Sequence, residues 1–436
     1  MQVTVETTEG LGRRMQVQVP AERIEKEVES RLNDMKSKVR LHGFRPGKVP
    51  MKVVRQRYGE QVRSEVLSEV LEATYAEAVQ QENLQPAGSP SIEELNAPSG
   101  EDLSYTATFE VMPQVQVKGV DEIQVSRPEV EVGDADVDQV LERLRRQHAT
   151  FEAVERAARH GDRVVVDFHG TVDGEEFAGN QGEDTPVEIG SGRMPPEFED
   201  GLVGISAGEQ RTVDYTFPEH FPDASIAGRQ AEFQVSAKQV EEPRLPAADD
   251  EFARQLGIEE GGLEALRGRI RESLERDRDQ AIRRRLKEQI MEGLYRRNSL
   301  ELPKALLDGE IAHLREQGGD AEQAPAGQLE EQARRRVTLG LVVNEIVREN
   351  EIKLDQERLQ RNLAEIASGY ERPREVIQHY TQDQRLMEGL QVAVLEDQVV
   401  DWAMQRVQVT GQPMSLQELM VGGADQQADD SAGEAS

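Results

Sequence analysis

The spacing of apolar residues changes along this chain of 436 residues, and these changes constrain its fold more than any other feature. Residues 1–112 mix strand-like alternation with helical spacing, and residues 150–246 show mainly alternation. In residues 247–421, apolar positions lie three or four apart almost throughout. Alternation is typical of half-buried strands, and the wider spacing is typical of amphipathic helices. The sequence therefore predicts a multidomain α+β protein with an antiparallel sheet domain in its middle and an all-α region after it.

Residues 1–112 are predicted to form one α+β domain. Alternating apolar residues predict strands at 3–5, 15–19 and 103–111. Pro20 is expected to open a helix. The apolar face of that helix would consist of Ile24, Val28, Leu32, Met35 and Val39. A second helix is expected from about residue 60, so the loop between the two helices should project away from the sheet.

The loop between these helices is short, basic and rich in glycine and proline. It consists of Gly43, Phe44, Arg45, Pro46, Gly47, Lys48, Val49 and Pro50. Proline fixes a backbone angle and glycine permits tight turns, so the loop should be a stiff tip that presents its aromatic ring between two cations. These residues alone leave two interpretations open: a docking tip, or an ordinary surface turn that happens to be basic.

The charge of this region differs from that of the rest of the chain. The sequence has 84 acidic and 52 basic residues, for a net charge of −32. Residues 31–57 contain nine basic residues and one acidic residue, so this segment is +8 and the remainder is −40. Phosphate contacts need Lys and Arg, so the acidic body argues against general nucleic-acid binding. A focused basic patch instead suits docking at one place on a polyanion.

The other regions are predicted from the same patterns. Residues 113–149 should form a connector with short extended pieces and one short helix. A long helix is expected at 263–294. Shorter helices are expected near 303–317, 328–350, 355–368 and 383–408. Residues 422–436 are rich in Gly, Ala, Asp, Gln and Ser, which predicts a disordered tail.

Several kinds of chemistry find no support in the sequence. The chain has no cysteine, its seven histidines are scattered, and no phosphate-binding glycine loop follows a strand, so neither a metal nor a cofactor is expected. Residues 204–208 match the Gly-x-Ser-x-Gly pattern of hydrolase nucleophiles, but a turn leading into a strand is expected there. The start is not that of a signal peptide and no apolar run approaches the ~20 residues of a membrane span, so we expect a soluble cytosolic protein without membrane contact.

Residues 150–246 concentrate aromatic side chains in a chain whose aromatic content is only 4%. A plain sheet core would explain this composition equally well. The segment, however, resembles FKBP-type peptidyl-prolyl isomerases through several runs in family order. These are Gly161-Asp162-Arg163-Val164, Phe168-x-Gly170, Asp173-Gly174-Glu175-Glu176-Phe177, Gly192-Arg193-Met194, Phe198-Glu199-x-Gly201-Leu202 and the turn from Gly204 to Glu209. The resemblance implies a proline pocket lined by Phe168, Phe177, Met194, Phe198, Phe221 and Phe233.

Such a pocket has a coherent physical basis. A peptide bond resists rotation with a barrier of about 18–20 kcal/mol, and prolyl bonds isomerise slowly enough to limit folding. The twisted amide is less polar than the planar one, so a dry aromatic pocket favours it without a general acid or base. Ala178 departs from the family pattern, which usually has an acid there. Pro195 also departs, because an N–H at that position can bind substrate in the family, so isomerase activity weaker than typical is expected.

Three segments, in order, resemble the bacterial trigger factor family. Residues 43–50 match that family's ribosome-docking signature, and the FKBP-like segment follows. Asn298-Ser299-Leu300-Glu301-Leu302-Pro303 and the next helix, with Leu306, Leu307 and Ile311, resemble its C-terminal chaperone domain, whose helices form arms around a cradle. The implied domains are a ribosome-binding domain at 1–112, a connector at 113–149, an isomerase at 150–246 and a helical substrate-binding domain at 247–421.

The resemblance also implies a cytoplasmic, partly ribosome-associated chaperone that binds nascent and unfolded polypeptides at the exit tunnel and isomerises prolyl bonds. Gly43, Phe44, Arg45, Pro46, Gly47, Lys48 and Pro50 would dock on exit-tunnel protein and RNA. A homodimer of the free protein is a further partner that the resemblance suggests. Two alternatives stay open: a free isomerase with accessory helical domains, and a holdase whose isomerase pocket is weak.

Overall fold

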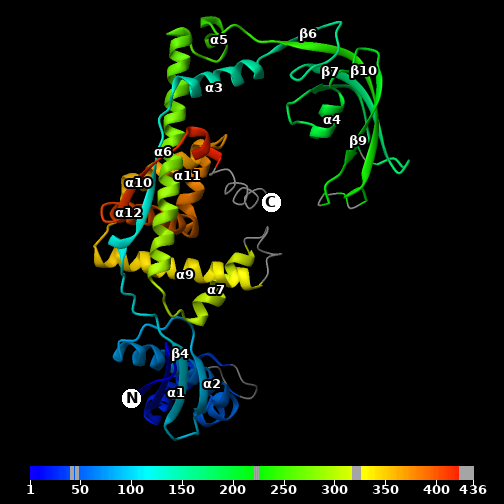
Figure 1. The fold of residues 1–436 in the computed structure, drawn as a ribbon. Helices are drawn as coiled ribbons and strands as arrows, with labels where there is room; N and C mark the ends of the chain where they lie inside the picture. Colours follow the sequence, from blue (N-terminus) through cyan, green and yellow to red (C-terminus); the bar gives the residue numbers. More distant parts are fainter. Residues whose placement is uncertain are drawn as a thin grey trace. The chain divides into compact units, whose positions relative to one another are not determined.

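The computed structural model describes residues 1–39, 44, 49–177, 179–219, 221, 223, 225–316 and 326–421. The chain forms two compact units (Figure 1). Unit 1 comprises Met1–Glu129 with Ala281–Ser436, and unit 2 comprises Val130–Gln280. The long helix α6 (Gly262–Arg297), which the apolar spacing predicts, begins in unit 2 and ends in unit 1.

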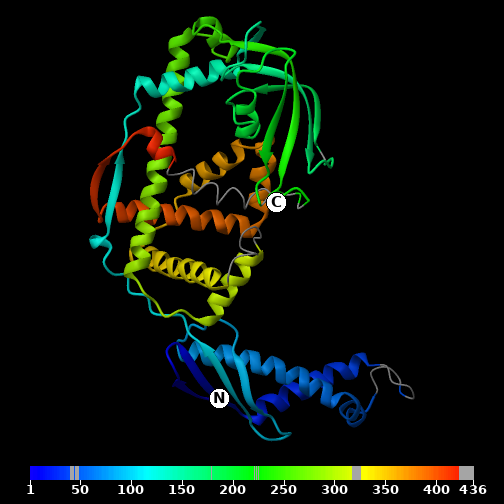
Figure 2. The same ribbon diagram turned by 45° about the vertical axis from the view of Figure 1, so that its right-hand side comes forward.

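The N-terminal part of unit 1 is a four-stranded antiparallel sheet in the order β1-β2-β4-β3, with two helices packed on it. Its elements are β1 (Gln2–Thr7), β2 (Gly12–Val19), α1 (Ala21–Lys38), α2 (Met51–Gln81), β3 (Ser91–Asn96) and β4 (Leu103–Glu110). The helices α1 and α2 lie side by side (Figures 1 and 2). Ile24, Leu32 and Val66 of the helices share one hydrophobic core with Met15 and Tyr105 of the sheet. The predicted strands and first helix are thus confirmed.

The second helix begins earlier than the sequence analysis predicts. It starts at Met51, directly after Pro50, and the predicted start at about residue 60 is wrong. A proline at a helix start is well tolerated because its missing N–H would have no intrahelical partner there. Val54 is buried and Tyr58 packs on the same core, so the four-residue spacing continues back from Val62 through both residues. Part of the basic segment therefore lies on α2 and not in the loop.

The sequence analysis does not predict strand β3. All six of its residues are exposed at the edge of the sheet, so the strand lacks the apolar alternation that reveals a half-buried strand. Its pairing with β4 shifts register around Glu94, whose φ is 50°. Bulges and charged residues are common on edge strands because they discourage pairing with other chains. A strand that must avoid pairing with other chains therefore does not show the apolar alternation of a half-buried strand.

The connector pairs with a segment near the far end of the chain. After η1 (Val120–Glu122), strand β5 (Gln124–Glu129) pairs in parallel with β11 (Gln408–Pro413). The predicted helix at 383–408 is therefore too long, because α12 (Gln384–Met404) ends and a strand follows. Val407 and Val409 are β-branched, which favours an extended chain. A pairing partner so distant in sequence leaves no local periodic signal.

The remaining helices of unit 1 agree with the predicted positions, with one addition. They are α7 (Lys304–Glu316), α9 (Ala326–Glu349), α10 (Gln356–Ser368) and α11 (Pro373–Gln382). The addition is α11, which has no fully buried residue. The core of this helical part joins Leu286, Ile290 and Leu294 of α6 with Val342 of α9 and Val399 of α12.

Two side-chain amides fasten the connector to α6. The amide of Gln289 accepts from the N–H of Ser126 at 2.8 Å and donates to its carbonyl at 2.9 Å. Asn298 is buried, accepts from the N–H of Lys118 at 2.9 Å and donates to the carbonyl of Leu294 at 2.8 Å. Both amides satisfy backbone groups that would otherwise need other partners. The first residue of the motif at 298–303 thus has a structural role.

Unit 2 is built on a five-stranded antiparallel sheet in the order β6-β10-β7-β8, with β9 also paired to β10. Its elements are α3 (Asp134–Gln147), β6 (Thr150–Ala153), β7 (Arg163–Val172), β8 (Gln181–Glu188), α4 (Pro196–Gly201), β9 (Gln210–Thr216), β10 (Gln230–Arg244) and α5 (Asp250–Gln255). The alternating apolar residues at 164–168, 213–217 and 233–235 lie in β7, β9 and β10, except that Phe217 directly follows the end of β9. The sequence analysis misses β6, β8 and α4, which are short or poor in apolar residues.

Unit 2 contains two separate hydrophobic cores. One lies on a face of the sheet, where α4 packs against β9 so closely that a Cβ on Gly201 would lie 2.6 Å from Val213. The other joins Val137 and Leu141 of α3 with Phe252 of α5 and Leu266 of α6. Residues in the second core can therefore be changed without touching the first.

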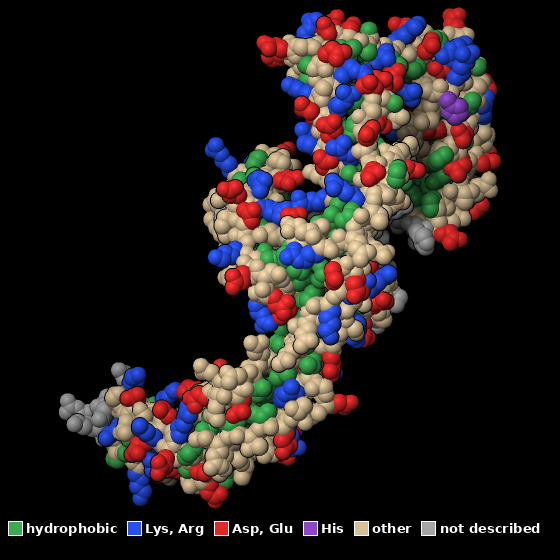
Figure 3. All heavy atoms as spheres, turned by 60° about the vertical axis from the view of Figure 1, so that its left-hand side comes forward, with side chains coloured by type: hydrophobic (Ala, Val, Ile, Leu, Met, Phe, Trp, Pro, Cys, Tyr) green, Lys and Arg blue, Asp and Glu red, His purple; other side chains and the backbone are tan. Residues whose placement is uncertain are grey.

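The surface of the protein carries charges of both signs. On the face drawn in Figure 3, Lys and Arg side chains are interspersed with those of Asp and Glu. Several form ion pairs, such as Arg23 with Glu77 at 2.7 Å. Within the described ranges, no helix combines the length and the apolar character that crossing a membrane requires.

Candidate functional site

Seven aromatic rings of unit 2 form a continuous cluster on the sheet face that α4 covers. They belong to Phe168, Phe177, Phe198, Tyr215, Phe217, Phe221 and Phe233. Strands β7, β9 and β10 contribute one ring each, α4 contributes one, and the other three come from the segments that follow β7 and β9. The cluster thus collects residues from the whole length of the sheet domain.

The centre of the cluster is a triangle of Phe168, Phe198 and Phe233. The centroid of Phe168 lies 5.9 Å from that of Phe198 and 6.0 Å from that of Phe233, and the last two are 5.5 Å apart. The rings meet edge to face, a geometry that contributes about 0.5–1.5 kcal/mol per pair beyond the buried area. Phe198 and Phe233 are buried, whereas Phe168 is partly exposed. The triangle is therefore an apolar floor with one accessible ring.

Phe177 links this triangle to a second group of rings. Its centroid lies 6.1 Å from that of Phe233 and 5.5 Å from that of Phe217, and Phe217 lies 4.8 Å from Phe221. Phe177 and Phe221 are partly exposed, and Phe217 is buried. The predicted pocket omits Phe217, although its alternation with Val213 marks it as facing the same side of the sheet.

The structure brings the predicted pocket residues together. The five phenylalanines belong to the ring cluster, and Met194 packs on the same hydrophobic core as a partly buried residue. Of the two departures, Ala178 lies outside the described residues. Pro195 is described and directly precedes the first turn of α4, with φ −50°. Proline has no N–H, so this position offers no backbone donor.

Two glycines give the rings their space. A Cβ on Gly170 would overlap the ring of Phe233, and a Cβ on Gly182 would lie 2.6 Å from Cε1 of Phe168. Real Cβ atoms do not approach other atoms so closely, so any side chain at either position would displace a ring. This close packing explains the glycine in the run Phe168-x-Gly170.

A buried carboxylate organises the loop that carries Met194. Glu199 of α4 is 2% exposed. Its Oε2 accepts from the N–H of Gly190 at 2.8 Å and of Gly192 at 3.2 Å, and its Oε1 accepts from the N–H of Met194 at 2.9 Å and Oγ of Ser191 at 3.1 Å. Burial by itself would raise the pKa of Glu199, but these four hydrogen bonds outweigh it and hold the pKa below its ordinary value.

A second buried carboxylate in unit 2 lies outside the ring cluster. Asp162 is 3% exposed, accepts two hydrogen bonds from the guanidinium of Arg156 and accepts from the N–H of Arg159 at 2.8 Å. Burial alone would raise the pKa of Asp162, but these bonds lower it. Asp162 fixes the turn before β7 and serves as a structural counterpart of Glu199.

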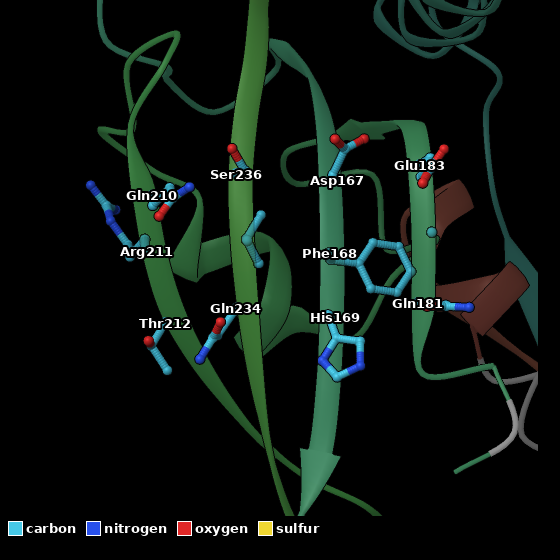
Figure 4. Close-up of a pocket in the computed structure, with 12 residues that line it drawn as sticks. Asp167, Phe168, His169, Gln181, Glu183, Gln210, Arg211, Thr212, Gln234 and Ser236 are labelled. Atoms are coloured by element: carbon cyan, nitrogen blue, oxygen red, sulfur yellow. The ribbon is translucent and has the colours of Figure 1, made fainter. Parts of the chain in front are cut away.

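A hollow of about 790 Å³ lies over the other face of the sheet, between β7, β8, β9 and β10 (Figure 4). Its lining is mostly polar and includes Asp167, His169, Thr212, Gln234 and Ser236, and Phe168 of the ring cluster also lines it. Successive side chains of a strand point to opposite faces, so Gln234 and Ser236 point away from the side of Phe233. Polar side chains do not match an apolar ligand, so the ring cluster is the better candidate site.

Two further features of the described residues concern groups that could take part in catalysis. Across the ranges that the structure describes, no group of three or more His, Cys, Asp or Glu residues is arranged to hold a metal ion. Residues 204–208 form a turn before β9, in which Glu209 accepts from the N–H of Ser206 at 3.0 Å. The interpretation of this Gly-x-Ser-x-Gly match as a simple turn is confirmed.

The predicted docking tip is only partly described. Phe44 is 41% exposed, and Pro50 directly precedes α2. The predicted docking residues Gly43, Arg45, Pro46, Gly47 and Lys48 lie outside the described residues, as does the predicted tail at 422–436. The helices that flank the tip carry exposed basic residues, which are Lys38, Lys52, Arg55 and Arg57.

Three family models match successive parts of the chain. Residues 1–144 match a model described as bacterial trigger factor protein, and residues 262–405 match its C-terminal counterpart. Residues 154–238, which contain the ring cluster, match the model of FKBP-type peptidyl-prolyl cis-trans isomerases.

Curated relatives match almost the whole chain. The trigger factor of Alkalilimnicola ehrlichii is 56% identical over 429 residues, which cover 96% of this chain and 95% of the relative. That of Halorhodospira halophila is 55% identical over 427 residues, covering 96% and 98%. A solved structure, from work titled "Promiscuous Substrate Recognition in Folding and Assembly Activities of the Trigger Factor Chaperone", has a TM-score of 0.56 at 20% identity. It covers 93% of this chain and 99% of that chain, and it shows the shared fold.

Proposed function

The chain belongs to the trigger factor family, and from this premise we propose which of its residues carry the family's activities. It is a ribosome-associated chaperone that binds nascent and unfolded polypeptides, and it has an FKBP-type peptidyl-prolyl isomerase domain. The proposed division of the chain is ribosome docking at 1–112, a connector at 113–149, isomerisation at 150–246, client binding at 247–421 and a tail at 422–436. The order of the three family models supports this division.

The proposed isomerase site is the accessible side of the ring cluster. Phe198 and Phe233 form its floor, and Phe168, Phe177, Met194 and Phe221 surround it as partly exposed side chains. A prolyl ring placed there leaves water, and the adjacent amide enters an environment of low polarity. Because the twisted amide has lost part of its resonance and polarity, such an environment stabilises it more than the planar ground state. The single observation that carries this proposal is the continuous cluster of rings with an exposed edge.

The proposal is tested by Phe168→Ala, since Phe168 is the partly exposed member of the central triangle. Loss of a ring contact worth roughly 1–2 kcal/mol in the transition state lowers kcat/KM for a short prolyl peptide about five- to thirtyfold. The control is Phe252→Ala, because Phe252 is 1% exposed in the separate core of α3, α5 and α6. That variant should be less stable but should keep kcat/KM within about twofold while folded. Equal losses in both variants would refute the site.

The proposed ribosome contact is the tip of the α1–α2 pair. Phe44 fills an apolar notch, Arg45 and Lys48 meet RNA phosphates and acidic protein groups, and Gly43, Pro46, Gly47 and Pro50 stiffen the tip. The exposure of Phe44 and the exposed basic residues on the flanking helices support this proposal.

The proposed client surface lies in the helical part of unit 1. Leu306, Leu307 and Ile311 on α7 are only partly buried, which leaves apolar area for non-directional contact with unfolded chains. We also propose a cytoplasmic location and a homodimer of the free protein, for which the family alone gives the motive.

A holdase with a weak isomerase site is the second candidate function. One observation favours it: Pro195 removes a backbone donor beside Met194. Turnover of a prolyl peptide by the parent protein no faster than in buffer would select this candidate over the first.

A further inference from the structure

The loop beside the proposed proline site uses its backbone donors within the protein. The N–H groups of Gly190, Gly192 and Met194 donate to the carboxylate of Glu199. The other donors of residues 189–193 also have partners: Ile189 donates to the carbonyl of Asp162, Ser191 to the carbonyl of Glu188, and Arg193 to Oγ of Ser191. Residues 195 and 196 are both proline and have no N–H. The backbone of residues 189–196 therefore offers a substrate no free N–H group.

Glu199 accepts the hydrogen bonds of three of these N–H groups. It directly follows Phe198 on α4, so one short helix supplies both the floor of the ring cluster and the acceptor for the loop. A carboxylate that accepts several N–H bonds is held firmly, because each bond to a charged group is stronger than a neutral one. Met194 thus has a backbone position that is set by Glu199 and not by the loop's own sequence.

We infer that Glu199 is a positioning residue for prolyl isomerisation: it holds Met194 against the ring cluster and withdraws the loop's N–H groups from the substrate. This inference rests on the proposed function of the ring cluster. The substrate class that follows is a prolyl segment recognised by apolar contact, without hydrogen bonds donated by the backbone N–H groups of this loop. Such recognition tolerates any flanking sequence, which suits a chaperone with many clients.

The variant Glu199→Gln tests whether Glu199 positions Met194 or only fills a buried space in the fold. A glutamine has one acceptor oxygen in place of two. If that oxygen faces Gly190 and Gly192, the amide NH₂ faces Oγ of Ser191, which can accept, and the N–H of Met194, which cannot. The reverse orientation opposes two N–H groups to the NH₂ and is worse. The substitution therefore releases Met194 selectively.

In the folded Glu199→Gln protein, we expect the amide hydrogen of Met194 to exchange about tenfold faster or more, as loss of a charge-assisted bond implies. The amides of Gly190 and Gly192 should change less. At a temperature where the protein is folded, kcat/KM for a short prolyl peptide should fall about tenfold, mainly through kcat, because Met194 no longer fits the twisted amide. The matched control is Asp162→Asn, which alters the other buried carboxylate of unit 2 and should lower thermal stability but leave kcat/KM within about twofold.

A double-mutant cycle with Met194→Ala decides whether Glu199 acts through Met194. If it does, Glu199→Gln has little further effect on kcat/KM in the Met194→Ala background. The same loss in both backgrounds overturns the inference and leaves the proposed site intact. An unchanged kcat/KM in Met194→Ala removes Met194 from the site, and the inference falls with it. If Glu199→Gln does not fold, hydrogen exchange of the parent decides: amides of Gly192 and Met194 without protection overturn the inference.

Discussion

The two sheets of this protein differ in how completely helices cover their apolar faces. In the N-terminal part of unit 1, α1 with 18 residues and α2 with 31 residues lie on a four-stranded sheet, and Tyr105 is only 2% exposed. In unit 2, the larger sheet is covered by α4, which has six residues. Aromatic side chains on this face, such as Phe168 and Phe177, consequently remain partly exposed.

This difference shows how the same architecture can give a scaffold or a site. A fully covered sheet face leaves nothing to bind, so the proposed function of the N-terminal region lies at the tip of its helix pair. An incompletely covered face loses roughly 25 cal/mol of stabilising free energy for each Å² of apolar surface that stays in water. Exposed apolar surface of this kind is typical of binding sites. In unit 2, the short α4 therefore leaves part of the ring cluster accessible to a ligand.

The largest expected effect is a loss of ribosome binding without a loss of prolyl-peptide turnover, which would assign the two activities to the N-terminal region and to unit 2. Replacement of Phe44, Arg45 and Lys48 by alanine should weaken ribosome binding about a hundredfold or more, because an apolar anchor and two phosphate partners are lost together. Cosedimentation with ribosomes measures this loss. Turnover of a short prolyl peptide should stay within about twofold of the parent value, since the ring cluster is untouched.

A charge-matched variant controls for general electrostatics. Replacement of Lys52, Arg55 and Arg57 by alanine removes three positive charges from the exposed side of α2. It should weaken cosedimentation less and mainly at low salt, because added salt screens the attraction that these exposed charges provide. If the two triple variants lose binding equally, the tip has no special role and the contrast between the regions fails.

The second prediction uses a glycine in each region. Gly170→Ala places a methyl group into the ring of Phe233, and overpacking of this kind costs about 1–3 kcal/mol of unfolding free energy. Gly59→Ala lies inside α2, where the nearest side-chain atom is 3.5 Å from the new Cβ, so it should stabilise by about 0.5–1 kcal/mol. The two effects thus have opposite signs.

Thermal unfolding of both variants, followed together with prolyl-peptide turnover, measures this contrast. Gly170→Ala should also reduce kcat/KM, because a displaced Phe233 disturbs the floor of the site, whereas Gly59→Ala should not. A Gly170→Ala protein with the stability and turnover of the parent would show that the rings have room to move, and the description of a tightly packed floor would be wrong.

The parts of the fold that the sequence predicts are those governed by local periodicity. The spacing from Ile24 to Val39 predicts α1, and the alternation around Val164 and Phe233 predicts β7 and β10. It misses β3 because an exposed edge strand needs no apolar face, and it misses β11 because its pairing with β5 is set by tertiary contacts. Local patterns report which side of an element is buried and nothing about its distant partner.

The candidate site also depends on contacts between distant residues that the sequence does not reveal. Resemblance named six pocket residues that the structure collects, but it omitted Phe217, whose burial depends on the rings of Phe177 and Phe221 around it. It also gave no reason for Glu199, because the acceptors of loop N–H groups depend on a turn conformation that apolar spacing does not encode.

The smallest expected effect is a difference in acid sensitivity between the units. Among the described residues, seven carboxyl groups have a lowered pKa, and five of them belong to unit 2. These five are Asp162, Asp167, Glu199, Glu209 and Asp223. A carboxyl group whose pKa is lower in the folded state stabilises the fold fully above its unfolded pKa near 4, and this contribution is lost as the pH falls through the folded pKa. Acid should therefore destabilise unit 2 before unit 1.

The single tryptophan makes this order measurable. Trp402 packs on the helical core of unit 1, so its fluorescence reports that unit, while prolyl-peptide turnover reports unit 2. On acidification below about pH 4, turnover should fall at a higher pH than the change in fluorescence. Asp162→Asn should lower thermal stability at pH 7 and flatten its fall in acid, because one group that takes up a proton on unfolding is gone. A fluorescence change that precedes the loss of turnover would mean that unit 1 is the acid-sensitive part, and that the buried carboxylates of unit 2 do not set its pH dependence.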